Sequence, residues 1–155
     1  MPYLFILVLF LTQLVWAQSP VHWNVRTWVE PTSVNSSFKD SVIISLEAQI
    51  EPGWHLYSQQ MQSEGPVPTR FDFSKCPVHL KLWKAPTEVG LHKNYVPAFG
   101  DTLSVFHVRA LFLQTAQWNS NRPFSFDVPV EYMVCNDRFC MPPKTDILHI
   151  SSPVK

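Results

Sequence analysis

From Val21 onward, hydrophobic and polar residues alternate over several stretches of the chain. Shorter stretches show the pattern at residues 21–29, 42–50, 78–82, 106–112 and 148–150. The clearest stretch places these side chains on one face: Phe124, Phe126, Val128, Val130, Tyr132 and Val134. A period of two residues is typical of a β-strand with one packed and one solvated face. About seven such strands predict an all-β fold, an antiparallel sandwich of two sheets.

The segments between these stretches look like turns and loops rather than helices. No stretch shows a sustained helical period, and the fourteen prolines punctuate short runs in a chain with only four glycines. We expect two long loops, at Ser58–Pro68 and Ala85–Gly100. Loops on a rigid sandwich commonly carry the functional residues, so these two segments are candidates for a functional role.

Residues 1–17 have the pattern of a secretory signal peptide. The apolar run from Tyr3 to Leu11 is too short to span a bilayer but has the length of a signal-peptide core. Val15 and Ala17 supply small residues for cleavage after Ala17, although the segment contains no Lys or Arg. We therefore expect residues 1–17 to be removed. The remainder, 18–155, is expected to form a single exported, soluble domain with no membrane span.

The zero net charge of the chain argues against nucleic acid as a partner. The chain has 12 Lys and Arg against 12 Asp and Glu, which gives a formal net charge of zero. Residues 1–17 contain no charged side chain, so the balance persists after their removal. A neutral domain lacks the basic surface that nucleic-acid binding requires, so we expect no nucleic-acid partner.

Cys135 and Cys140 enclose Asn-Asp-Arg-Phe in the connection between the longest alternating stretch and the next expected strand. Cysteines that flank such a turn can approach to disulfide distance. Cross-linking so short a loop stabilises the fold by only about 2 kcal/mol, through the entropy that the unfolded chain loses. The pair therefore contributes little to stability and is a candidate redox centre. From spacing alone, a purely structural disulfide stays open as an alternative. So does a zinc site, which only His107, His149 or Cys76 can complete.

Residues inside and after the pair influence its chemistry. Arg138 favours a thiolate at the neighbouring cysteines, whereas Asp137 opposes it. Pro142 and Pro143 fix φ and lack an N–H, so the segment after the pair is rigid. In disulfide exchange one thiolate attacks, and a second cysteine resolves the mixed disulfide. Cys76 lies outside this pair, and we expect it to be a free, partly buried thiol.

Four motifs occur in one order along the chain. They are Pro52-Gly53-Trp54-His55-Leu56-Tyr57-Ser58, Gly65-Pro66-Val67-Pro68-Thr69, Phe99-Gly100, and Tyr132-Met133-Val134-Cys135 followed by Cys140-Met141-Pro142-Pro143. With these motifs the chain resembles the N-terminal periplasmic domain of DsbD, the bacterial transmembrane thiol–disulfide reductase. The last motif is the most specific, because Tyr-x-x-Cys, a short gap and Cys-x-Pro-Pro occur together in that family.

The resemblance implies an immunoglobulin-like sandwich in the periplasm with the cysteine pair at one end. In the family this domain takes electrons from the membrane-embedded and thioredoxin-like parts of DsbD. It passes them to periplasmic partners such as the disulfide isomerase and the thioredoxins of cytochrome c maturation. By the family pattern, Cys140 attacks the partner disulfide and Cys135 resolves the mixed disulfide. An aromatic cap loop shields the pair, and the chain order maps its cap residue to Phe99, with Tyr95 second.

Two departures from the family pattern modify this expectation. The gap between the cysteines is four residues, whereas some members have five. The chain also carries no membrane span and no thioredoxin-like Cys-x-x-Cys domain, so we expect a stand-alone domain whose electron donor is a separate membrane protein. The prediction is a periplasmic dithiol carrier with protein-disulfide reductase chemistry, no metal, and no cofactor beyond its own two cysteines.

Two other functions remain as alternatives. The first is a non-catalytic immunoglobulin-like binding module in which the disulfide is structural. The second is a metal-handling protein, which four scattered methionines support poorly. Trp54, His55 and Tyr57 are expected mainly as core and strand-edge packing rather than as site residues.

Overall fold

The computed structural model describes residues 19–30, 41–61, 65–118 and 122–153, so the expected signal peptide at 1–17 lies outside the described residues. The described residues form strands and no helix, as the alternating pattern predicts. The all-β fold class is therefore confirmed, although the strands form three sheets rather than the expected two. The strands are β1 (Val21–Glu30), β2 (Ser41–Ile50), β3 (His55–Tyr57), β4 (Arg70–Phe71), β5 (Lys81–Val89), β6 (His92–Val96), β7 (Asp101–His107), β8 (Arg109–Gln117), β9 (Ser125–Tyr132), β10 (Val134–Cys135) and β11 (Lys144–Ser151).

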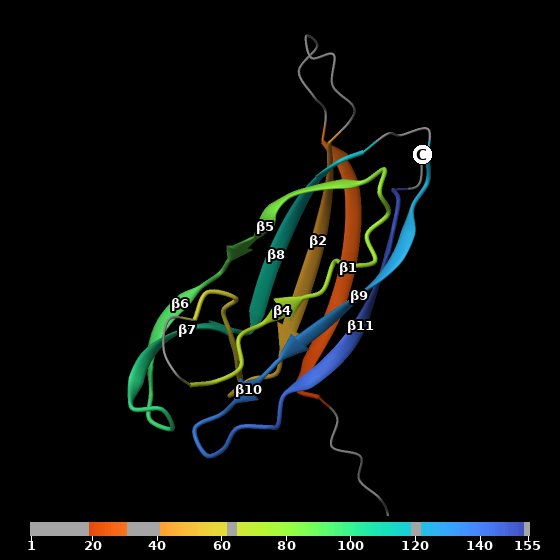
Figure 1. Ribbon diagram of the computed structural model, residues 1–155. Helices are drawn as coiled ribbons and strands as arrows, with labels where there is room; N and C mark the ends of the chain where they lie inside the picture. Colours follow the sequence, from red (N-terminus) through yellow and green to blue (C-terminus); the bar gives the residue numbers. More distant parts are fainter. Residues whose placement is uncertain (1–18, 31–40, 62–64, 119–121, 154–155) are drawn as a thin grey trace, which may run out of the picture.

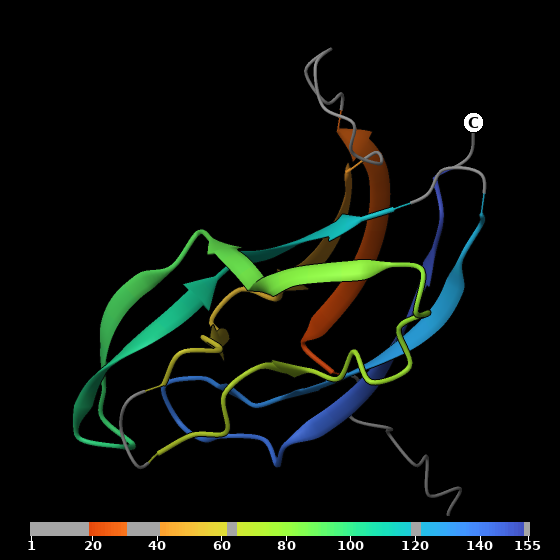
Figure 2. The same cartoon turned by 45° about the horizontal axis from the view of Figure 1, so that its top comes forward.

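The strands form three antiparallel sheets (Figure 1). The first sheet has the order β1-β2-β8-β5, the second β10-β3-β7-β6 and the third β11-β9-β4. Seen from a second direction, β6 and β7 extend to one end of the molecule, away from the long strands β9 and β11 (Figure 2). The second sheet therefore forms a distinct end of the sandwich.

The main core lies between the first and third sheets. Alternate residues of β8 and β9 are buried, which is the expected period of two. In β2 the five consecutive residues 42–46 are buried, so its middle is covered on both faces. Aromatic rings join the two sheets: Trp23 of β1 lies 5.7 Å from Tyr132 of β9, and Phe71 of β4 lies 5.0 Å from Phe112 of β8, measured between ring centroids. Each fully buried large side chain contributes about 1.5–3 kcal/mol, so this core supplies most of the driving force for folding.

Two alternating runs that read as single strands are each divided between two sheets. The run through Phe106 and Ala110 breaks at Val108, which is exposed and has a φ of 60°. There the chain passes from β7 in the second sheet to β8 in the first. The run ending at Val134 breaks at Met133, between β9 and β10. The period of two continues across both breaks, so hydrophobic spacing alone does not reveal them.

The expected loop at Ala85–Gly100 is wrong. This segment holds the end of β5 and all of β6. Most of β6 is exposed, because it is an edge strand in which only the last residue, Val96, is buried, so it shows no alternation. A bulge at residues 83–87 shifts the register of β5 against β8 and hides its pattern. The strand expected at residues 78–82 begins only at Lys81, after a turn that leaves Val78 exposed.

The second sheet has two different faces. Leu56 of β3, Phe106 of β7 and Val134 of β10 point into the main core. The adjacent residues on these strands, Tyr57, Val105 and Cys135, belong to a second, smaller buried cluster. That cluster also contains Val96 and Leu103. One face of this sheet thus anchors it to the sandwich, and the opposite face carries the cysteine.

Candidate functional site

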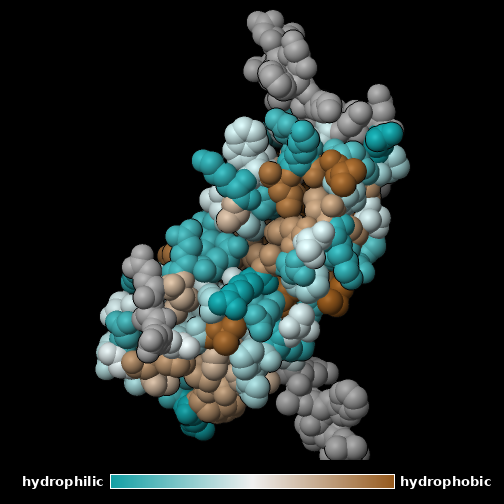
Figure 3. Space-filling model, in the orientation of Figure 1, coloured by the Kyte–Doolittle hydropathy of each residue, from teal (hydrophilic) through white to brown (hydrophobic). Residues whose placement is uncertain are grey.

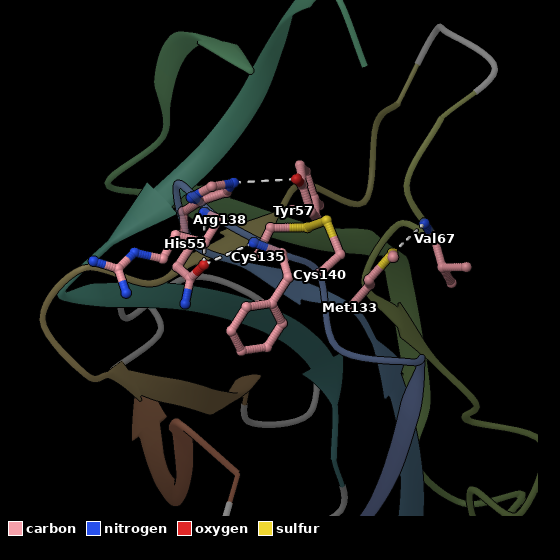
Figure 4. The surroundings of a disulfide bond; sticks show 9 residues. His55, Tyr57, Val67, Met133, Cys135, Arg138 and Cys140 are labelled. Carbon is pink, nitrogen blue, oxygen red and sulfur yellow. Dashed lines mark hydrogen bonds between the residues drawn. A yellow bond between two sulfur atoms is a disulfide. The ribbon is translucent and has the colours of Figure 1, made fainter. Parts of the chain in front are cut away.

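Cys135 and Cys140 form a disulfide across a tight loop (Figure 4). Their Cα atoms lie 4.0 Å apart, and the two residues form an antiparallel bridge. Asn136 closes the loop, since its side-chain oxygen accepts hydrogen bonds of 2.9 Å from the backbone N–H groups of Arg138 and Phe139. Asn side chains commonly stabilise turns in this way. The hairpin connection expected between the cysteines is therefore present, between β9 and β11.

The two cysteines differ in accessibility. Cys135 ends β10, pairs with His55 of β3, and is fully buried. Cys140 is only partly buried and packs at the edge of the small cluster. Since an incoming disulfide must reach a sulfur atom in line, Cys140 is the more accessible of the two. This asymmetry agrees with the order of attack that the family resemblance implies.

Phe99, the expected cap residue, packs on the cluster that contains the cysteines. Its ring meets the edge of Tyr57 at a centroid distance of 6.1 Å. A turn holds it there: the N–H groups of Phe99 and Gly100 both donate to the carbonyl oxygen of Val96 at 3.0 Å. Gly100 has a φ of 65°, a conformation that glycine adopts without strain. Phe99 therefore packs beside the cysteine pair, and its role as a cap stays a prediction.

The second cap candidate, Tyr95, has a different environment. Its side chain is 65% exposed and is not part of the buried cluster. It lines an open cavity of about 330 Å³ beside the cysteine loop. Asp137 and Arg138, the expected modulators of the cysteines, line the same cavity and are both exposed. The structure thus groups these three residues beside the disulfide, in contact with solvent.

His55 and Tyr57 lie at the site, although the sequence suggested mainly packing roles for them. His55 Nε2 and the Tyr57 hydroxyl are 3.1 Å apart, and Figure 4 shows Tyr57 beside the disulfide. Their spacing of two residues on β3 puts both on the face that carries Cys135. That spacing was visible in the sequence, but the pairing of β3 with β10 was not.

The surroundings of the site shift the pKa values of His55 and Tyr57. Burial lowers the pKa of His55 below its ordinary value of 6.5, neighbouring His107 lowers it further, and Asp137 opposes this shift. Burial raises the pKa of Tyr57 to about 12. At neutral pH the imidazole is therefore uncharged and the phenol protonated, so neither carries a charge next to the disulfide.

Of the three residues weighed as additional zinc ligands, His107 lines the cavity beside the cysteine loop, whereas Cys76 and His149 lie elsewhere. Cys76 packs against the main core, and its thiol lies 3.4 Å from the Leu80 carbonyl oxygen. Burial raises the pKa of this thiol. His149 hydrogen-bonds to Asp127 and Ser125 on the β9–β11 ladder. Within the described parts of the chain, no group of three or more His, Cys, Asp or Glu is arranged to hold a metal ion.

Comparison with known families settles the classification. The family model for the N-terminal domain of the thiol:disulfide interchange protein DsbD matches residues 27–152. The chain belongs to this family. DsbD N-terminal domains are periplasmic domains of thiol–disulfide exchange, and their partners are periplasmic thiol–disulfide proteins. Within residues 19–30, 41–61, 65–118 and 122–153, no helix is long and apolar enough to cross a membrane.

Among solved structures, the reduced N-terminal domain of DsbD from Neisseria meningitidis is similar to this chain. The two share 15% sequence identity with a TM-score of 0.49, over 83% of this chain and 84% of the Neisseria chain. A search of curated proteins gave no match.

Proposed function

We propose that this DsbD N-terminal-like domain carries electrons to the disulfides of partner proteins through Cys135 and Cys140. The observation that carries the proposal is the unequal exposure of two bonded cysteines at one end of the sandwich, one buried and one partly accessible. A purely structural disulfide needs no accessible sulfur, whereas an exchange centre needs one.

Each half-reaction follows from this asymmetry. In the reduced domain the Cys140 thiolate attacks one sulfur of the partner disulfide, and the other partner sulfur leaves as a thiolate. Cys135 then attacks Cys140, which restores the Cys135–Cys140 bond and releases the second partner sulfur as a thiolate. The partner gains the two electrons that the domain loses. A donor dithiol reverses these steps on the domain and returns it to the reduced state.

Hydrophobic side chains beside the loop supply a docking surface for the partner. Phe139 is 55% exposed and meets the edge of Trp54 at a centroid distance of 5.4 Å. Hydrophobic atoms lie at the lower end of the molecule in Figure 3, where the cysteine loop lies in Figure 1, as well as at the centre and upper right of that view. An exposed aromatic ring, supported by the partly buried Trp54, next to a reactive sulfur suits a transient protein contact. Phe99 shields the pair until such a partner displaces it.

The domain receives its electrons from a membrane protein and works in the periplasm after removal of residues 1–17. Its functional unit is residues 18–155. The acceptors are thioredoxin-like or isomerase-type proteins of the periplasm, including those of cytochrome c maturation.

Single-cysteine variants test the proposal by trapping. A Cys135→Ser variant, reduced and mixed with a periplasmic extract, is expected to retain partners as mixed disulfides, because Cys140 attacks and nothing resolves the product. Cys140→Ser is expected to capture none. Both variants carry Cys76→Ser, so that the remaining thiol contributes no adducts.

The pattern of capture distinguishes the alternatives. Capture by Cys140→Ser alone would reverse the roles assigned to the two cysteines. If neither variant retained a protein while both stayed folded, the disulfide would be structural and the domain a binding module.

A further inference from the structure

The burial of Cys135 poses a chemical problem for the proposed exchange cycle. Before it attacks Cys140, the Cys135 thiol must lose its proton, because the nucleophile is a thiolate. Cys135 is fully buried, so bulk water does not reach it directly. Burial in apolar surroundings also disfavours the thiolate. A nearby group that accepts this proton would remove the difficulty.

A row of side chains crosses the second sheet from Cys135 toward the surface. Cys135 of β10 is the cross-strand partner of His55 on β3, and His55 is the cross-strand partner of His107 on β7. Directly opposed residues share one face of a sheet, with Cβ atoms about 4.5–5.5 Å apart. The His55 and His107 ring centroids are 5.9 Å apart. The register therefore places an imidazole beside the buried cysteine and a second imidazole beyond it.

The outer end of this row meets solvent. His107 is partly exposed, and its Nε2 is 2.8 Å from the side-chain nitrogen of Asn94 on β6. The ring of His92, also on β6, is exposed, and its centroid lies 6.0 Å from that of His107. His55 and His107 both line the open 330 Å³ cavity beside the cysteine loop. A proton received by His55 thus has a short way out, through the cavity or along the histidines.

The groups that face His55 keep it ready to accept a proton. On its own strand, the Tyr57 hydroxyl meets Nε2 and holds the ring in place. From β7, His107 disfavours a charged imidazole, while Asp137 of the cysteine loop favours it. Arg138 lines the same cavity. The ring is uncharged at neutral pH, so one of its two nitrogens carries no proton and can accept one.

We propose that His55 is the base that takes the proton of Cys135 in the resolving step. The inference rests on the proposed exchange function and assigns one further residue to it. The proton passes from the Cys135 sulfur to the unprotonated nitrogen of His55. The resulting thiolate attacks the Cys140 sulfur and breaks the bond between Cys140 and the partner. The electron pair of that bond leaves on the partner sulfur, and the protonated imidazole releases its proton to solvent by way of the cavity.

A small aryl disulfide separates the two chemical steps. The reduced protein, with Cys76→Ser to remove the other thiol, is mixed with dithiobis-nitrobenzoate, whose coloured thiolate is released twice. The first release reports attack by Cys140, and the second reports closure by Cys135. With His55→Gln we expect the second phase at neutral pH to slow by about tenfold or more, since general bases commonly contribute at least this much. The first phase should keep its rate.

The pH profile separates a base from a structural residue. At alkaline pH the thiolate forms without help, so the rates of the wild type and His55→Gln are expected to converge. Equal slowing at every pH, or no slowing of the second phase, would overturn the inference. The matched control is His149→Gln, which removes an exposed histidine from the β9–β11 ladder. Both of its phases should match the wild type.

Two further outcomes can be told apart: a His55→Gln variant that does not fold, and a failure of the proposed exchange function itself. If His55→Gln unfolds, the wild type itself provides the test. Its second phase should slow on acidification as the imidazole becomes protonated, and a rate simply proportional to hydroxide concentration would contradict the inference. If the wild type releases no second thiolate, the exchange function fails and the inference fails with it. A normal wild-type reaction with an unaffected His55→Gln variant would refute the base alone.

Discussion

At the scale of single residues, the site consists of a bonded cysteine pair surrounded by aromatic and imidazole side chains. The sequence was sufficient to select Cys135 and Cys140, because their spacing and the following prolines are local features. It also selected Phe99, through its position in the family motif. His55 was predicted poorly because its role depends on cross-strand pairing with Cys135, a contact between residues 80 positions apart in the sequence. Local pattern carries no information about such pairings.

Removal of the Phe99 ring tests its role as a cap. In the reduced protein with Cys76→Ser, Phe99→Ala is expected to increase the rate of alkylation of the pair by iodoacetamide several-fold, because the ring packs on the cysteine cluster. The rate is followed by mass spectrometry. Tyr95→Ala is the matched control, since Tyr95 is 65% exposed and lies outside that cluster. An unchanged rate in Phe99→Ala, or a larger increase in Tyr95→Ala, would remove Phe99 from the cap.

At the scale of elements, the site is built where the chain passes from a strand of one sheet to a strand of another. The chain passes between sheets at Val108 and at Met133, and the second crossing delivers Cys135 to the small sheet. The alternating pattern predicted the long strands β8 and β9 well, because each has one packed face. It also found β2, although residues 42–46 of that strand are buried on both faces. It failed for β6 and for the bulged strand β5, whose exposed and irregular positions leave no period to detect.

The bulge in β5 depends on one buried amide. The side-chain nitrogen of Gln114 lies 3.3, 3.2 and 2.8 Å from the carbonyl oxygens of Trp83, Lys84 and Thr115. Gln114→Leu should therefore lower the free energy of unfolding by about 1–3 kcal/mol, because three partly buried hydrogen bonds of its amide are lost. Urea denaturation measures this change. Gln117→Leu, on the same strand but only partly buried, is the control, and an equal loss there would contradict the bonding role of Gln114.

At the scale of the whole molecule, a large core supports a small functional end. The main cluster joins the first and third sheets and includes the inner face of the second. The smaller cluster, on the outer face, contains the disulfide and the ring of Phe99. The energy of folding is therefore concentrated away from the cysteines. This separation suits the proposed carrier role, which requires the domain to stay folded when the pair is reduced and re-oxidised.

The buried imidazole makes the stability of the whole domain sensitive to acid. The pKa of His55 is lowered in the folded state from its ordinary 6.5, so below pH 6.5 the unfolded chain binds more protons than the folded one. The stabilising contribution of the neutral imidazole is complete above pH 6.5. It is lost as the pH falls through the folded-state pKa. We expect the free energy of unfolding to fall less steeply on acidification in His55→Gln than in the wild type.

Denaturation curves at a series of pH values measure these slopes. The exposed-histidine variant His149→Gln serves as the control and should lose stability on acidification at the wild-type rate. An identical slope in His55→Gln and the wild type would show that burial of His55 has no energetic consequence.

The reduction potential of the Cys135–Cys140 pair tests the central claim most directly. The purified protein, with Cys76→Ser, is equilibrated in glutathione buffers of defined ratio, and the fraction of reduced pair is measured after rapid alkylation. A carrier that both accepts and donates electrons is expected to have a potential of roughly −120 to −270 mV. A potential below about −300 mV would mean a structural disulfide and would contradict the exchange function.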